Sequence, residues 1–214
     1  MPAVLFESQY HPPITFFAEI IGAAAVGLEA QENYHKQTYR NRCLILTAQG
    51  VQSLTVPVLD GNRSGKVKTT EIKIDYRQNW VHQHWRTIQT AYGGTPYFEY
   101  YADYLRDIYV QKPHRLFDLN FAFLRFYLRC LRLRIPVILT TEYLPPSPAH
   151  SLIPSTPQFL DCRDWLTPKA PLATKPDRKS VRFYAQTFGK DFVPGLSILD
   201  LLFMQGPAAG DFLA

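Results

Sequence analysis

The sequence predicts an α/β fold, a single domain with a mixed β-sheet, an N-terminal βαβ-like unit, a β-hairpin and a packed helical segment. Three observations lead to this prediction. Strand, helix and strand patterns follow one another within the first thirty residues. Two apolar runs flank Ala48-Gln49-Gly50, which is typical of a hairpin. Residues 79–132 then carry three successive helical patterns, and we expect all of residues 1–214 to form one domain.

The N-terminal unit begins with a short strand at residues 3–8 and ends with a strand at residues 25–30. Pro12 and Pro13 force an extended turn between them, because proline fixes φ and restricts the residue before it. A helix follows, with apolar residues from Phe17 to Ala24 at helical spacing. The strand–helix–strand order predicts a parallel pair, and no G-x-G-x-x-G dinucleotide fingerprint is present.

The middle of the chain predicts strands at residues 42–47 and 52–59, and a further half-exposed strand where residues 69–75 alternate. Helices are expected at residues 79–92, 96–110 and 113–132, the first ended by Gly93-Gly94. A strand at residues 136–142 follows them.

The C-terminal part is dominated by a Pro-rich loop region at residues 143–179, within which residues 144–160 are too rich in proline for regular structure. A helical turn at residues 161–165 and a short strand at 181–187 are expected. Ser197 to Asp200 form a capping box that opens a short helix closed by Gly206-Pro207, which makes Asp200 a helix-capping carboxylate.

Composition and charge favour a globular protein that binds no nucleic acid. The net charge is +5, without a Lys/Arg block or a recognised nucleic-acid-binding motif. The three cysteines show no CxxC spacing, which fits a reducing compartment. The apolar stretch at residues 14–28 is short and interrupted by Glu19, so it predicts no membrane span. With no basic segment before an apolar core at the N-terminus, we expect a cytoplasmic protein.

A polar and cationic run at residues 33–42 lies between two predicted strands and contains no aliphatic residue. Such a run is either a basic surface loop or a ligand-facing one, because loops held by a rigid sheet often carry function. Arg40 and Arg42, with Lys36, suit recognition of a carboxylate or phosphate. We expect contacts to the substrate from Tyr10, Asn33, Tyr34, Lys36, Gln37, Tyr39, Arg40, Asn41, Arg42, Trp80 and Tyr92.

His84 falls on the apolar stripe of the helix at residues 79–92, next to Trp80 and Trp85. It is either a buried, hydrogen-bonded residue or a general base. Glu7 and His11 follow the first strand and form a second acid/base candidate, since ligands bind beyond the carboxyl ends of strands in open α/β sheets. The alternative for Glu7 and His11 is a turn with incidental polar groups. His82 and His84 point to different helix faces, and no metal-binding spacing is present.

Several segments carry the pattern of a known family. They are Tyr10-His11-Pro12-Pro13 with Phe16-Phe17, Tyr34 to Arg42, Leu54 to Val58, Asn79 to Tyr92, Pro96-Tyr97-Phe98 and Leu196 to Phe203. Through these segments the chain resembles the WbqC-like protein family over nearly its whole length, and its polar run is similar to the form found in Bacteroidetes-type bacteria. Unlike the commoner first motif of that family, Gln-Pro-Asn-Tyr-Leu-Pro-Trp, this chain has Glu7, Ser8 and Gln9 before Tyr10, and Pro13 in place of Trp.

Some members of this family lie in O-antigen gene clusters and have been proposed as glycine transferases. The resemblance therefore implies a bacterial acyl or aminoacyl transferase that acts on a sugar or sugar nucleotide in surface polysaccharide biosynthesis. The alternative is a non-catalytic binding protein for a small anionic metabolite, phosphorylated or carboxylated. The sequence indicates neither a cofactor nor an oligomeric state.

Overall fold

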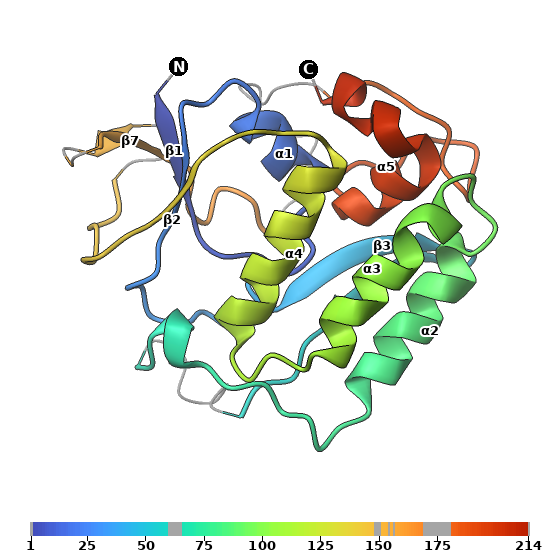
Figure 1. Cartoon of the computed structure of the whole chain (residues 1–214), viewed down its shortest axis with the longest axis horizontal. Coiled ribbons are helices and arrows are strands. Elements are labelled where there is room, and N and C mark those ends of the chain that lie inside the picture. The colour runs from blue at the N-terminus through green and yellow to red at the C-terminus, as the bar shows by residue number, and fades with distance from the viewer. Residues whose placement is uncertain are drawn as a thin grey trace.

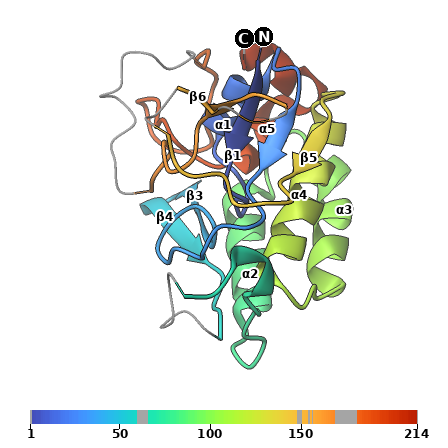
Figure 2. The same ribbon diagram turned by 90° about the vertical axis from the view of Figure 1, so that its left-hand side faces the viewer.

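The computed structural model describes residues 2–59, 66–147, 151–153, 155, 157–168 and 181–213, and its centre is a five-stranded mixed sheet (Figures 1 and 2). The strand order is β5-β2-β1-β7-β6. β1 pairs in parallel with β2 and β7, β2 pairs in parallel with β5, and β6 is antiparallel to β7. The predicted βαβ unit is confirmed. The elements are β1 Ala3–Phe6, α1 Ile14–Ile20, β2 Val26–Leu28, β5 Val137–Leu139, β6 Leu152–Ile153 and β7 Phe159–Asp161.

Successive residues of β1 enter two different cores, because side chains alternate across a strand. Val4 and Phe6 belong to the main core, to which the helices contribute. Ala3 and Leu5 belong to a small core on the other face, with Phe159 of β7. The sheet is therefore covered on one face by helices and on the other by the segment around β6.

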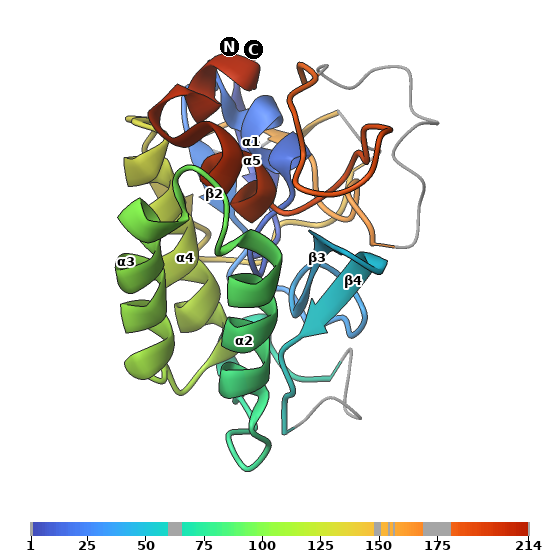
Figure 3. The ribbon, with the colours of Figure 1, turned by 90° about the vertical axis from the view of Figure 1, so that its right-hand side faces the viewer.

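The predicted hairpin is present as β3, Arg42–Thr47, and β4, Gly50–Thr55 (Figure 3). Gly50 has φ +100°, a left-handed conformation that glycine adopts at no steric cost. Cys43 and Ile45 of β3 enter the main core, whereas Gln52 and Ser53 of β4 are exposed.

The three predicted helices run side by side (Figures 1 and 3). They share the main core with residues of the hairpin and the sheet. Their bounds are α2 Trp80–Tyr92, α3 Phe98–Val110 and α4 Leu116–Cys130. The last helix, α5, spans Ile198–Gln205 and continues into a 3₁₀ turn at Gly206–Phe212. Ser197 accepts a hydrogen bond from the Leu199 backbone N–H at 3.3 Å, so it is a helix cap as predicted.

The prediction of a strand at residues 69–75 is wrong. Thr69–Glu71 form a 3₁₀ turn, and the rest of the segment makes only isolated bridges, such as Lys73 with Arg115. Ile72 and Ile74 are buried, which produces the alternating pattern without a neighbouring strand. The backbone instead bonds to the start of α4, where Leu116 N–H donates to the Ile72 carbonyl at 2.9 Å.

The C-terminal predictions need three corrections. The proline-rich residues 144–160 contain regular structure, since β6 and the start of β7 lie there. Residues 181–187 are irregular rather than a strand, and residues 169–179 of the predicted loop lie outside the described part. Asp200 is not a cap. It is fully buried and accepts hydrogen bonds from Tyr92, Tyr184 and Gln186, and burial raises its pKa.

Candidate functional site

The carboxyl ends of the four parallel strands meet at one edge of the sheet. From β1 the chain passes to β2 and β5 on one side, and β7 later pairs with the other side of β1. The strand order thus reverses at β1. Open α/β sheets bind ligands outside the carboxyl ends of the strands at such a reversal.

A cavity of about 440 Å³ opens at this edge, and we call it the carboxyl-edge cavity. Three segments enclose it: the one after β2, the one after β5 and the turn after β7. Asn33 alone of the sequence-predicted ligand residues lines it. The lining residues are Gln31, Glu32, Asn33, His35, Tyr143, Pro146, Ser147, Asp161, Arg163 and Asp164.

Arg40 lies behind the cavity wall and is already paired. Its side chain is fully buried and forms two hydrogen bonds of 2.7 Å with the Glu32 carboxylate and one of 2.7 Å with Asp164. Burial acts to lower the pKa of Arg40, but the bonds to Glu32 and the nearby carboxylates outweigh it and raise that pKa. Its charge therefore organises the wall of the cavity and faces no ligand directly.

Glu7 extends this cluster from the end of β1. One carboxylate oxygen accepts from the Gln9 side-chain amide at 2.8 Å and the other from the Asp164 backbone N–H at 3.0 Å. Burial raises the pKa of Glu7 from 4.5 to about 7, and the charge of Arg40 limits the rise. A carboxyl group that titrates near neutrality is suited to acid/base chemistry.

Arg163 forms the second ion-pair cluster at the edge. It pairs with Asp161 at 2.7 Å and with Glu29 at 3.2 Å, and it donates to the Leu144 carbonyl at 2.6 Å. Arg163 and Asp161 both line the cavity. Together the two clusters surround the cavity with more carboxylates than guanidinium groups, which suits hydroxyl and ammonium groups better than anions.

The two predicted catalytic histidines lie away from this cavity, in a buried chain of ring hydrogen bonds. His11 Nε2 is 2.7 Å from the Tyr109 hydroxyl, and its Nδ1 bonds to the Tyr127 hydroxyl. The Tyr109 hydroxyl lies 2.6 Å from that of Tyr10, which lies 2.8 Å from His84 Nδ1. Tyr10 and His84 are thus hydrogen-bonded to each other inside the core.

Both ring nitrogens of His11 have protein partners, and His84 bonds to Tyr10 through Nδ1 and also to the backbone of Thr55. Burial lowers the pKa of His84 from 6.5 to about 4 and that of His11 well below its usual value. His11 adopts φ +42°, a strained conformation that these bonds hold in place. The arrangement favours a structural role for both residues.

The other sequence-predicted ligand residues are scattered over the fold. Asn33, Lys36 and Gln37 are exposed, and Arg42 is half-buried. Asn41 donates to the Val56 carbonyl at 3.1 Å, between the polar run and the end of β4. Buried in the core are Tyr34, Tyr39, Trp80 and Tyr92.

Sequence reasoning missed most of the cavity, including Glu32, Tyr143, Ser147, Asp161, Arg163 and Asp164. One signal was present. Asp161-Cys162-Arg163-Asp164 places three charges directly after an apolar pair, as at the end of a buried strand. The described residues contain no group of three or more His, Cys, Asp or Glu side chains placed to hold a metal ion. None of the described helices is long and apolar enough to cross a membrane.

Comparison with known proteins gives a family and one relative. The family model described as the WbqC-like protein family matches residues 7–212. The "Uncharacterized protein Rv1507c" of Mycobacterium tuberculosis is 30% identical over 228 residues, which cover 98% of this chain and 96% of that protein. The Bacteroidetes-type variant finds no support in these comparisons. No solved structure matches the chain significantly.

Proposed function

The chain belongs to the WbqC-like protein family, and from this premise we propose that it is a transferase that moves an acyl or aminoacyl group onto an amino or hydroxyl group of a sugar or sugar nucleotide. The family resemblance suggests surface polysaccharide as the destination. The observation that carries the proposal is Glu7, a carboxyl group with a pKa of about 7 at the end of β1, beside the carboxyl-edge cavity.

The cavity suits a polar acceptor in size and chemistry. Its volume of about 440 Å³ lies within the range of small-molecule sites. Carboxylates of Glu32, Asp161 and Asp164 accept hydrogen bonds from hydroxyl or ammonium groups, and the Asn33 amide offers both donors and acceptors.

Glu7 takes the proton in this proposal. The acceptor nitrogen or oxygen attacks the acyl carbon of an activated donor, such as a thioester. As the new bond forms and the carbon–sulfur bond breaks, Glu7 accepts the proton of the nucleophile and the thiolate leaves. Glu7 lies behind the Asp164 backbone, so the turn at Arg163-Asp164 shifts to admit the nucleophile. Asp164 has φ +53°, which marks this turn as strained.

The alternative function, a binding protein for an anionic metabolite, has less support at this edge. Arg40 was expected, with Arg42 and Lys36, to bind an anionic group, and two carboxylates already neutralise it. An anionic ligand here would also meet the carboxylates of Glu32 and Asp164.

A transfer assay tests the proposal. Acetyl and glycyl thioester donors are offered together with amino-sugar and sugar-nucleotide acceptors, and mass spectrometry follows the gain of the acyl group. Glu7→Gln should lower the transfer rate by about 100-fold or more while acceptor binding persists. The exposed Asp211→Asn serves as control. The wild-type rate should rise with pH through about 7, as Glu7 loses its proton.

Two results would count against this function. Full activity of Glu7→Gln would remove Glu7 from the chemistry. Acceptor binding by the wild type without transfer from any activated donor would favour the binding-protein alternative.

A further inference from the structure

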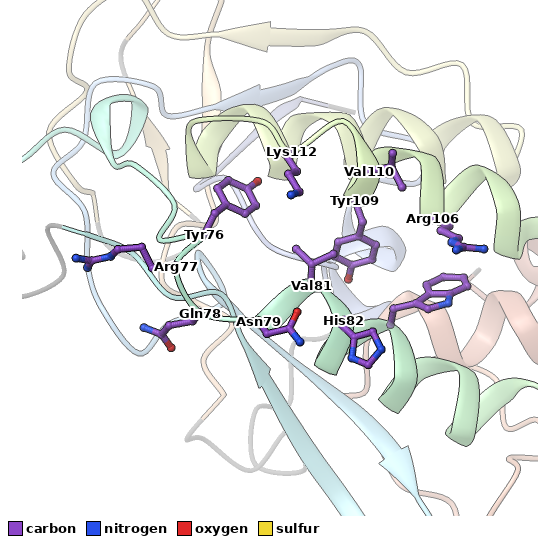
Figure 4. Close-up of a pocket in the computed structure, with 11 residues that line it drawn as sticks. Tyr76, Arg77, Gln78, Asn79, Val81, His82, Arg106, Tyr109, Val110 and Lys112 are labelled. Atoms are coloured by element: carbon purple, nitrogen blue, oxygen red, sulfur yellow. The ribbon is translucent and has the colours of Figure 1, made fainter.

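A second cavity, of about 460 Å³, lies between the start of α2 and the end of α3 (Figure 4), and we call it the α2–α3 cleft. It shares no lining residue with the carboxyl-edge cavity, so it is a separate site. Its lining residues are Tyr76, Arg77, Gln78, Asn79, Val81, His82, Trp85, Arg106, Tyr109, Val110 and Lys112.

The lining of the cleft is cationic. It contains Arg77, Arg106 and Lys112 and no carboxylate. Arg77 pairs with Asp75 at 2.8 Å, whereas Arg106 and Lys112 form no ion pair with any described residue. Arg106 lies on α3 and Lys112 lies just beyond the end of that helix (Figure 4). Two cations without carboxylate partners on one wall favour an anionic ligand.

The first turn of α2 adds to this preference. The backbone N–H groups of the first helical residues, Trp80 to His82, have no intrahelical partner. Asn79, at the cap position, makes no side-chain cap bond and lines the cleft. Unpaired N–H groups and the helix dipole at an N-terminus attract anions.

Three aromatic residues, Tyr76, Trp85 and Tyr109, also line the cleft. Tyr109 is fixed because its hydroxyl bonds to Tyr10 and His11, and the Tyr76 hydroxyl donates to the Pro113 carbonyl at 2.8 Å. Trp80 packs on both rings from behind, and its indole N–H is buried without a hydrogen-bond partner among the described residues. Tyr109 is buried, so the half-buried rings of Tyr76 and Trp85 offer the stacking surface for a planar ring.

Lys112 occupies a position where glycine is usual. It directly follows the last residues of α3 with φ +46°, and its N–H bonds to the Tyr109 carbonyl at 3.2 Å. Glycine adopts this helix-ending conformation without steric cost. A lysine held there keeps a positive charge at the cleft in spite of that cost.

We propose that the α2–α3 cleft binds an anionic ligand with a planar ring, of the size and chemistry of a nucleoside diphosphate. The diphosphate lies between Arg106, Lys112 and the start of α2, and the ring lies against the aromatic wall. This inference stands apart from the transferase proposal, since none of its residues lines the carboxyl-edge cavity.

Isothermal titration calorimetry with three probes tests the proposal on the full chain. ADP carries ring and charge, adenosine carries the ring alone, and inorganic diphosphate carries the charge alone. ADP should bind at least about tenfold more tightly than either partial probe, with an affinity that falls as salt rises.

Three variants locate the binding. Lys112→Gly removes the charge at a backbone position that favours glycine, so the melting temperature should hold or rise while ADP affinity falls at least about fivefold. Arg106→Gln should weaken ADP binding to a similar degree. Arg86→Gln is the matched control. It removes a single positive charge, from α2, and Arg86 lines a different cavity. This variant should leave the ADP affinity within about twofold of the wild type.

Three outcomes would overturn the inference. The first is no heat with ADP at millimolar concentration. The second is equal weakening by Arg86→Gln, which would show a general effect of charge. The third is a diphosphate affinity equal to that of ADP, which would remove the ring from the site.

Discussion

At the scale of single residues, burial and partners decide roles that residue type leaves open. Arginine is suited to binding anions, and the sequence predicted that Arg40 contacts an anionic ligand. In the fold its guanidinium is fully buried between Glu32 and Asp164. Its positive charge is neutralised by carboxylates of the protein itself.

Replacing Arg40 should therefore destabilise the fold. Arg40→Met leaves the carboxylates of Glu7 and Glu32 buried without their cation, which costs on the order of 3–5 kcal/mol. Urea unfolding at neutral pH measures the change. Arg42→Met is the control, because Arg42 is half-buried and forms no ion pair with a described residue, and it should change stability much less. Equal stability of Arg40→Met and the wild type would contradict the paired arrangement.

His84 should behave as a structural residue. His84→Gln disturbs the bonds to Tyr10 and to the Thr55 backbone in a buried setting, so we expect a loss of about 1–3 kcal/mol. Urea unfolding measures this loss, and the transfer assay measures the activity of the folded variant. A variant that is fully stable but has lost activity would instead assign His84 to catalysis.

At the scale of elements, the length of a helix or strand determined whether the sequence predicted it. The helices α2, α3 and α4 are 13, 13 and 15 residues long, and each shows its apolar stripe over several turns. β6 and β7 have two and three residues, too few for a period to appear, and they lie within a proline-rich stretch. The place of β7 in the sheet depends on pairing with β1, more than 150 residues away, and β6 in turn pairs with β7.

Gly27 in β2 shows how tightly the sheet packs. A Cβ at this position would lie 2.6 Å from the Phe159 ring and 2.9 Å from the Leu5 side chain. Gly27→Ala should therefore cost about 1–3 kcal/mol and lower the melting temperature. Gly94→Ala, where a Cβ would meet nothing within 4 Å, is the control and should be close to neutral. A neutral Gly27→Ala would mean that the Phe159 ring and the Leu5 side chain do not pack over Gly27.

At the scale of the whole molecule, the candidate site is assembled from distant segments. Arg40 pairs with Asp164 across 124 residues and Arg163 with Glu29 across 134. The sequence placed Glu7 and His11 beyond the carboxyl end of the first strand; Glu7 bonds to the Asp164 backbone at this edge, whereas His11 bonds to Tyr109 and Tyr127 away from the cavity. The sequence could not predict that β7 contributes to the edge, because no local pattern indicates which strand lies beside β1.

The pH dependence of stability should combine buried carboxyl groups and buried histidines, which have opposite effects. The pKa of Glu7 rises from 4.5 to about 7 on folding, so its stabilising contribution is complete below 4.5 and is lost as pH rises towards 7. The pKa of His84 falls from 6.5 to about 4, so its contribution is complete above 6.5 and is lost as pH falls towards 4. Asp200 acts in the sense of Glu7, and His11 in the sense of His84.

Between about pH 4.5 and 6.5 the contributions of Glu7 and His84 should oppose each other, since each amounts to about 3 kcal/mol. Relative to the wild type, Glu7→Gln should gain stability as pH rises through this window, because it no longer loses the Glu7 contribution. Relative to the wild type, His84→Gln should lose stability over the same window. Urea unfolding of the three proteins at about pH 5 and pH 6.5 measures these slopes. If both variants kept the slope of the wild type, neither group would titrate with the shifted pKa that its burial implies.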